Sequence, residues 1–233
     1  MSTLDPVISL VNDRALLISF SHHVDIPHIQ RRVLRLAQDL RKHSLCSASN
    51  PDGPLRDIVP GPGNLMLELT PDASMPLTEL TERLESCWKR LEDRPSLPPR
   101  TVEIPVCYGG EHGPDLMQVA RHTGLTPQSV IERHAANTYE VLCLGFQPGF
   151  PYLHGLDPAL NTPRRDTPRS RIPAGSVAIG ADRTGIYPSP SPGGWLIIGH
   201  TELKLFDADN PERPTLLLPG DRVRFTIAEA IHV

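Results

Sequence analysis

Four arginines on a proline-rich segment are the residues of this chain best suited to binding a small anion. The segment reads P-R-R-D-T-P-R-S-R, and its basic residues are Arg164, Arg165, Arg169 and Arg171. Guanidinium groups bind carboxylates and phosphates through paired hydrogen bonds, and a stiff backbone lowers the entropy cost of positioning them. Ion pairs with Asp157, Asp166 or Asp182 would account for any one arginine equally well, but the cluster as a whole predicts an anion site.

Glycines and a glutamine near these arginines add further donors. Gly193 and Gly194 follow Pro192, and glycine turns can leave backbone N–H groups free to bind an oxyanion, although plain turn geometry accounts for some of them. Gln147 lies between Phe146 and Pro148 and carries an amide that both donates and accepts, which suits an amide or lactam substrate. The density of rings, prolines and glycines here predicts rigid turns around a hollow.

Hydroxyl and imidazole groups complete the predicted site. Ser176, Thr184 and Tyr187 are the candidate hydroxyl ligands. His200 is the candidate general acid or base, because imidazole titrates near neutral pH, and a core histidine bound to the backbone is an equal alternative. The sequence has no G-x-S-x-G elbow and no zinc signature, so we expect neither a nucleophilic hydrolase acting alone nor a metal site.

Length and composition limit the classes of function. A chain of 233 residues that is 39% apolar suits one large domain or two small ones. The net charge of −4 and the pI near 6.2 indicate neither a nucleic-acid nor a membrane partner. The four cysteines form no C-x-x-C pair, which favours reduced thiols. Without a secretory signal or an apolar run of about 18 residues, the protein is expected to be soluble and cytoplasmic.

Residues 1–95 predict a small α+β domain. Two apolar runs between Val7 and Phe20, split by Asn12 and Asp13, predict a hairpin. Apolar residues at steps of three and four predict two helices, one over residues 26–40 and one over residues 77–91. Each helix would bury one face against the sheet.

The segment between the two helices predicts a loop followed by one strand. Ser44 to Gly63 is rich in Ser, Pro, Gly and Asp and is expected to be an exposed loop, and an alternating strand then ends at Leu69. Asp25 is the predicted N-cap of the first helix, and Ser74 or Asp72 that of the second.

Residues 100–233 predict a second domain that is mainly β. The boundary is R-P-S-L-P-P-R, from Arg94 to Arg100, because three prolines resist both helix and strand pairing. An alternating strand begins at Thr101, and two short helices follow, over Asp115 to His122 and from Thr126. Short strands joined by Gly/Pro turns then indicate a closed or nearly closed barrel: S-V-A-I-G, G-W-L-I-I-G, K-L-F-D, T-L-L-L-P-G-D and V-R-F-T-I.

Long motifs in a fixed order carry a resemblance that runs nearly end to end. They are V-E-I-P-V-C-Y-G-G-E-H-G-P-D-L, G-F-Q-P-G-F-P-Y-L, P-R-R-D-T-P-R, P-A-G-S-V-A-I-G, T-G-I-Y-P, P-G-G-W-L-I-I-G-H-T and L-F-D. With these motifs the chain resembles the family that includes the B subunit of 5-oxoprolinase, the KipI sporulation-kinase inhibitor and allophanate hydrolase subunit 1. Among these, the overall pattern is most similar to the 5-oxoprolinase protein.

The resemblance implies an α+β N-terminal domain followed by a mainly-β cyclophilin-like barrel domain. It also implies two partners, a KipA-like C subunit with a related barrel and an A subunit. Together these proteins would open 5-oxo-L-proline to L-glutamate at the expense of ATP with Mg²⁺, and the isolated chain would be inactive. In this interpretation His200, Arg169 and Gln147 are catalytic. The substrate-binding residues would be Arg164, Arg165, Ser176, Thr184, Tyr187, Gly193 and Gly194.

Two other functions remain open at this stage. One is a regulatory module that inhibits a histidine kinase, as KipI does, and the other is half of a carboxyltransferase acting on urea or allophanate. Neighbouring genes for the A and C subunits would favour the 5-oxoprolinase interpretation, whereas a sporulation-kinase operon would favour the inhibitor.

Overall fold

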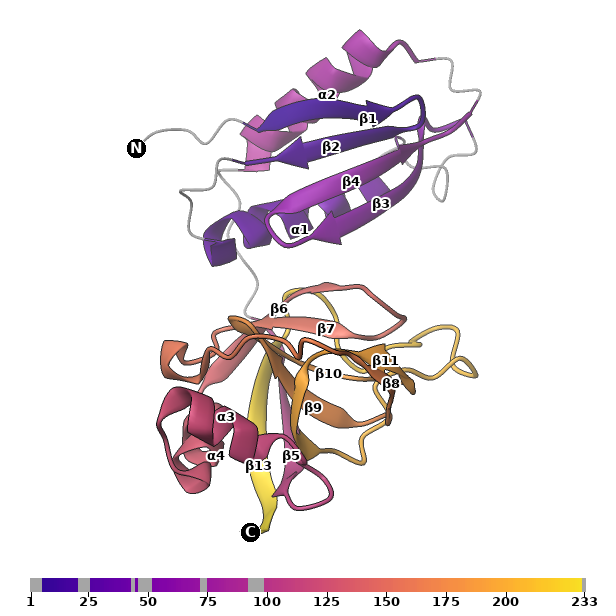
Figure 1. Ribbon diagram of the computed structural model, residues 1–233. Helices are drawn as coiled ribbons and strands as arrows, with labels where there is room; N and C mark the ends of the chain where they lie inside the picture. Colours follow the sequence, from indigo (N-terminus) through magenta and orange to yellow (C-terminus); the bar gives the residue numbers. More distant parts are fainter. Residues whose placement is uncertain are drawn as a thin grey trace. The chain divides into compact units, whose positions relative to one another are not determined.

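The structure is a computed structural model that describes residues 6–20, 26–42, 45, 52–71, 75–91 and 99–231 (Figure 1). The chain divides into two compact units, Met1–Pro98 and Pro99–Val233. The predicted N-caps Asp25, Asp72 and Ser74 lie outside the described residues.

The N-terminal unit contains a four-stranded antiparallel sheet in the order β1-β2-β4-β3. Its strands are β1 (Val7–Asn12), β2 (Ala15–Ser19), β3 (Leu55–Gly61) and β4 (Asn64–Leu69). The predicted hairpin is confirmed, because Asn12 pairs with Ala15 and its side chain accepts a hydrogen bond from the Arg14 N–H at 2.8 Å. The loop predicted from Ser44 to Gly63 is wrong over β3, whose Leu55 and Ile58 are buried.

Two helices bury their apolar faces in this unit. They are α1 (Ile26–Lys42) and α2 (Leu77–Arg90), and both agree with the periodicity of the sequence. Leu36 of α1 and Leu84 of α2 join buried residues of the sheet in one hydrophobic cluster. The Arg32 guanidinium lies 3.9 Å from the centre of the Trp88 ring, so a cation–π contact also links the helices.

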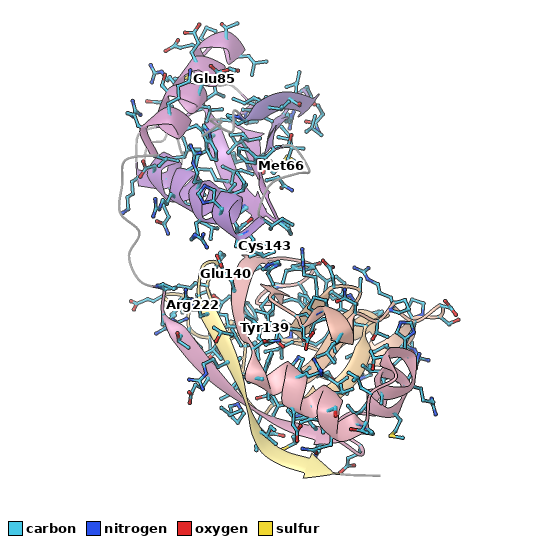
Figure 2. All side chains as sticks on the ribbon, turned by 90° about the vertical axis from the view of Figure 1, so that its left-hand side faces the viewer. Met66, Glu85, Tyr139, Glu140, Cys143 and Arg222 are labelled. Carbon is cyan, nitrogen blue, oxygen red and sulfur yellow. The ribbon has the colours of Figure 1, made fainter. Side chains whose placement is uncertain are left out.

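The second unit is built on a closed barrel in the order β10-β7-β6-β13-β5-β12-β9, as the short strands predicted. Its strands are β5 (Thr101–Gly109), β6 (Thr138–Leu144), β7 (Pro151–His154), β9 (Ser176–Gly180), β10 (Arg183–Ile186), β12 (Leu196–His200) and β13 (Arg222–Ile231). β13 runs parallel to β5 and antiparallel to β6, where Arg222 lies opposite Glu140 and Val223 opposite Tyr139 (Figure 2).

Three helical segments and a small ribbon complete the second unit. The helices are α3 (Leu116–Thr123), α4 (Pro127–Ala136) and the short η2 (Pro158–Leu160), and the ribbon pairs β8 (Arg169–Ile172) with β11 (Ser191–Gly193). The predicted cap of α4 is confirmed, since Thr126 Oγ1 accepts from the Ser129 N–H at 3.1 Å. Asp115 stands at the N-cap of α3, yet its side chain makes no capping hydrogen bond.

Two of the predicted strands do not form. K-L-F-D and T-L-L-L-P-G-D share only an isolated bridge between Phe206 and Thr215. Pro214 and Pro219 interrupt this segment, and proline cannot donate to a ladder. Leu205 and Leu217 nevertheless reach the barrel core.

The strand β9 is buried on both of its faces. Val177 and Ile179 belong to the core inside the barrel, whereas Ala178 belongs to a separate cluster outside it. Aromatic residues of the motif segments cover that outer face, so the motifs pack onto the outside of the barrel wall.

Candidate functional site

Asp115 lies at the centre of the arginine cluster. Its side chain is 4% exposed and accepts two hydrogen bonds from Arg169, each 2.7 Å long, and one from Arg165 at 3.3 Å. The Ile197 N–H also donates to it, at 2.8 Å. The fork of Arg169 therefore binds a carboxylate of the same chain in the bidentate geometry that an external anion would use. Sequence reasoning proposed other aspartates as partners and missed this one.

Arg169 is the first residue of β8, and the pairing of β8 with β11 positions it next to the Asp115 carboxylate. Arg169 lies opposite Gly193, and the Arg165 N–H donates to the Gly194 carbonyl at 2.8 Å. A Cβ at Gly193 would lie 2.5 Å from the Tyr187 hydroxyl oxygen, so only glycine lets the ribbon lie this close to Tyr187. The predicted residues Gly193, Gly194, Arg165 and Arg169 are thus brought together.

Arg164 differs from its neighbours. Its guanidinium carbon lies 5.7 Å from the centre of the Trp195 ring, and its side chain is exposed. Burial raises the pKa of the nearby Tyr187 hydroxyl, while a backbone hydrogen bond from Trp195 and the positive charges of Arg164 and Arg169 act in the opposite direction. The Tyr187 hydroxyl is therefore neutral at physiological pH and lies in a positive field.

Rings form a packed layer beneath Arg164. Phe150 makes edge contacts with Phe146, Tyr152, Tyr187 and Trp195, at centroid distances of 5.2 to 5.6 Å. This layer covers Ala178 and Ile197 on the outside of the barrel wall. Edge-to-face packing fixes the rings, so the layer is a rigid support for the groups above it.

The loop that contains Gln147 is closed by its own hydrogen bonds. Gln147 Oε1 accepts from Ser189 Oγ at 3.0 Å and its Nε2 donates to the Ser189 carbonyl at 3.2 Å. Gly145 N and Phe150 N donate within the loop as well. Next to Gln147, Phe146 has φ of +67° and is 61% exposed, so a large apolar ring is held in solvent in a strained conformation.

His200 lies at the far end of β12. Its Nε2 is 3.0 Å from the Ala174 carbonyl, its Nδ1 is 3.4 Å from Glu202, and its ring stacks on His112 at 5.6 Å. Since a carbonyl only accepts, Nε2 carries a proton and Nδ1 remains for exchange. Ser176 lies opposite His200 in the β9–β12 pair and is 3% exposed.

Thr184 lies inside the barrel, away from the other predicted residues. It donates to the Ala178 carbonyl at 3.0 Å, so its oxygen accepts from His134 Nε2 at 2.9 Å. His134 Nδ1 must then accept from the Tyr108 hydroxyl at 2.8 Å. Complete burial lowers the pKa of His134 to about 3. This network stabilises the core, and because Thr184 is fully buried its hydroxyl is out of reach of a ligand.

The main chain of Tyr187 joins the remaining groups. Its carbonyl accepts from Gly175 N at 2.7 Å and its N–H donates to the Ser176 carbonyl at 3.0 Å. Tyr187 therefore connects the end of the barrel that carries His200 to the arginine ribbon. The predicted residues other than Thr184 thus lie on the outside of the barrel wall. We call this region the outer strip; it contains Gln147, Arg164, Arg165, Arg169, Ser176, Tyr187, Gly193, Gly194 and His200.

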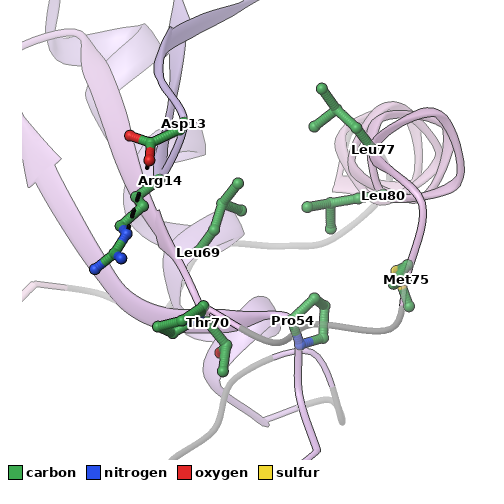
Figure 3. Close-up of a pocket in the computed structure, with 9 residues that line it drawn as sticks. Asp13, Arg14, Pro54, Leu69, Thr70, Met75, Leu77 and Leu80 are labelled. Atoms are coloured by element: carbon green, nitrogen blue, oxygen red, sulfur yellow. Dashed lines mark ion pairs between the residues drawn. The ribbon is translucent and has the colours of Figure 1, made fainter.

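A cavity of about 290 Å³ lies elsewhere, in the N-terminal unit (Figure 3). Leu69, Leu77 and Leu80 form its apolar wall, and Asp13 and Arg14 lie at its rim. It contains none of the predicted site residues. The hollow expected from the sequence therefore does not coincide with this cavity.

The described part of the chain shows neither a metal centre nor a membrane span. No three His, Cys, Asp or Glu side chains in it are grouped so as to hold a metal ion. Likewise, none of the helices in the described ranges is long and apolar enough to cross a bilayer.

Comparison with known proteins agrees with the motifs. The family described as carboxyltransferase domain, subdomain C and D, matches residues 6–217. The chain is 44% identical to the B subunit of 5-oxoprolinase from Escherichia coli O157:H7 over 93% of each chain. It is 48% identical to the protein of the same name from Haemophilus influenzae, over 76% of this chain and 81% of that one.

A solved structure has the same fold in a longer chain. The crystal structure of TTHA0988 superposes with a TM-score of 0.75 at 40% identity and covers 93% of this chain. The match spans only 40% of TTHA0988 itself. The chain therefore belongs to the family of the carboxyltransferase domain, subdomain C and D, and its relatives in that family include the B subunit of 5-oxoprolinase.

Proposed function

We propose that this chain is the B subunit of an ATP-dependent 5-oxoprolinase. With the A and C subunits, it would help convert 5-oxo-L-proline to L-glutamate, with hydrolysis of ATP, in the cytoplasm. The observation that carries the proposal is the similarity to the Escherichia coli protein over 93% of both chains. The family match over residues 6–217 includes every motif of the outer strip.

The described residues contain no group of three or more His, Cys, Asp or Glu side chains that could hold a metal ion by themselves. Mg²⁺ in nucleotide sites is bound by one or two carboxylates together with the phosphates, so the nucleotide would have to complete such a site. Arg165 and Arg169 are also already bound to Asp115. We therefore assign ATP and Mg²⁺ to the level of the assembled complex, in which this chain would contribute one side chain that binds an oxyanion.

The outer strip suits a small cyclic amide that bears a carboxylate. Its ring layer offers an apolar support, and Arg164 supplies a positive charge above that layer. His200 has a proton fixed on Nε2, so Nδ1 is the atom that would exchange a proton during ring opening. Arg169 and Gln147 would contribute to catalysis by holding the ribbon and the loop in place.

Reconstitution tests this function. The chain would be co-expressed with its candidate A and C subunits, and glutamate release from 5-oxoproline would be measured with and without ATP. We expect ATP-dependent release from the complex of all three proteins and none from the isolated chain. A well-folded complex that releases no glutamate would contradict the proposal.

The family description favours one second candidate, half of a carboxyltransferase module. The same complex would then transfer a carboxyl group from a carboxylated carrier to the nitrogen of urea or a related amide, and the proton lost by that nitrogen would return to the carrier. Carboxylated product, in the absence of any glutamate, would move the assignment to this function.

A further inference from the structure

The arginines of the cluster differ in whether their guanidinium groups already form an ion pair within the chain. Arg165 and Arg169 share the Asp115 carboxylate, whose side chain is 4% exposed. An external anion would have to displace that carboxylate in order to reach their N–H groups. These two guanidinium groups are therefore poor sites for a ligand.

Arg164 has the opposite arrangement. Its guanidinium carbon lies 5.7 Å from the centre of the Trp195 ring, and a cation–π contact uses the positive charge and not the N–H donors. Among the described residues, no carboxylate forms an ion pair with it. The side chain is exposed, so a ligand can approach those donors.

The support under Arg164 is rigid. Trp195 is 6% exposed and packs edge-on against Phe150, at a centroid distance of 5.6 Å. A Cβ at Gly180 would lie 2.5 Å from the Trp195 ring, so the ring lies directly on the backbone of β9. A guanidinium placed on a fixed ring loses less entropy when it binds.

Hydrogen bonds also fix the backbone next to Arg164. Arg165, the next residue, is held by its N–H bond to the Gly194 carbonyl and by Asp115. Trp195 directly follows Gly194, so the cation and its ring are carried by segments that are hydrogen-bonded to each other. Arg165 and Arg169 therefore stabilise the fold through Asp115, whereas the guanidinium of Arg164 remains available to a ligand.

We infer that Arg164, placed over Trp195, is the residue that binds the oxyanion of the ligand. The inference rests on the proposed function and narrows its anion site from the cluster to one side chain. The oxyanion is either the carboxylate of 5-oxoproline or a phosphate of ATP, because both fit a guanidinium fork.

The test compares two lactams and ATP on the reconstituted complex. Arg164→Gln removes the charge, and 2-pyrrolidone is the same lactam as 5-oxoproline without the carboxylate. We expect the variant to raise the KM and the calorimetric Kd for 5-oxoproline about tenfold or more, while inhibition by 2-pyrrolidone stays unchanged. A rise in the KM for ATP instead would support the anion site and assign it to phosphate.

Arg121→Gln is the control. Arg121 is an exposed arginine in the last turn of α3 and lies outside the site motifs, and its substitution is expected to leave both constants unchanged. The inference is overturned if Arg164→Gln leaves all constants at wild-type values, or if Arg121→Gln weakens binding equally. Thermal midpoints within about 2 °C of wild type would show that neither exposed substitution unfolds the chain.

The binding titration separates this inference from the proposed function. If the wild-type complex binds 5-oxoproline but releases no glutamate, the proposed function fails and the Arg164→Gln titration still decides the inference. If the wild-type complex binds neither 5-oxoproline nor ATP, both are contradicted.

Discussion

Phe146 combines left-handed backbone with an exposed ring, and each is unfavourable for a large apolar residue. The ring contacts Phe150 and Tyr187 by its edge, at 5.5 and 6.3 Å, which compensates in part. Conformational strain of this kind persists where surrounding structure imposes it, here through the hydrogen bonds of Gln147.

We predict that Phe146→Gly is more stable than Phe146→Ala by about 1 kcal/mol, the reverse of the usual order for these two residues. Both variants lose the ring contacts, and only alanine keeps the penalty of positive φ. Urea denaturation of the two variants measures the difference. Equal or greater stability of the alanine variant would mean that the loop relaxes out of the left-handed region.

His134 gives the protein a pH dependence of stability. Burial lowers its pKa to about 3 in the folded chain, against about 6.5 when unfolded, so only the unfolded state gains a proton between these values. This contribution to stability is complete above pH 6.5 and is lost as the pH falls. From pH 7.5 to pH 5, we expect the free energy of unfolding to fall by about 2 kcal/mol from this group.

Urea titrations of the wild-type chain at the two pH values measure the fall. Asp157 and Asp207 have lowered pKa values as well, but their contributions are lost only below about pH 4, outside this window. A His134→Asn variant, although less stable overall, should show a flatter dependence. If the two slopes are the same, the loss arises from another group.

The sequence identified the arginine donors of the site but not Asp115, the carboxylate that accepts their hydrogen bonds. The spacing of P-R-R-D-T-P-R marks Arg165 and Arg169, but Asp115 lies 50 residues before Arg165, and local spacing carries no information on such pairs. Thr184 shows a related limit. A short strand exposes alternate side chains to two faces, and the sequence does not say which face becomes the interior of a barrel.

Among the elements, the ribbon β8–β11 depends on the buried pair of Arg169 and Asp115. We predict that Asp115→Ala costs about 3 kcal/mol or more of stability, because it leaves Arg169 and the Ile197 N–H without their acceptor. Chemical denaturation measures the loss. A double-mutant cycle with Arg169→Ala should show strong coupling, since the second substitution removes the unpaired charge.

The ion pair of Lys204 and Asp207, whose side chains are 63% and 38% exposed, is the matched control for that cycle. Solvent screens this pair, so Lys204→Ala is expected to leave the denaturation midpoint unchanged. Similar effects for the buried and the exposed pair would contradict a structural role for Asp115.

Elements with a strong local signal could be predicted, whereas those that depend on their neighbours could not. The period of α1 and α2 and the Asn12 turn are local, and the structure confirms them. β3 was missed because its segment is rich in turn residues. It includes Pro60, which an edge strand tolerates because its outer N–H groups need no partner.

For the molecule as a whole, each unit has a hydrophobic core of its own. One cluster is drawn from residues 8–91 and the other from residues 102–225, with no member in common. We predict that residues 99–233 expressed alone keep their β structure and melt cooperatively. Circular dichroism with a thermal scan measures this. A fragment that is unfolded or that melts without a transition would show that the barrel needs the N-terminal unit.

The place of β13 in the barrel has a consequence during synthesis on the ribosome. β5 pairs with β13 along its whole length, yet the paired residues lie about 120 positions apart in the chain, since Thr101 lies opposite Arg222. At translation rates of about 5–20 residues per second, β5 waits roughly 6 to 24 seconds for its parallel neighbour. Until then β5 and β6 are edge strands, each with one unpaired side. Binding of a chaperone during this interval would protect these edges from pairing with another chain.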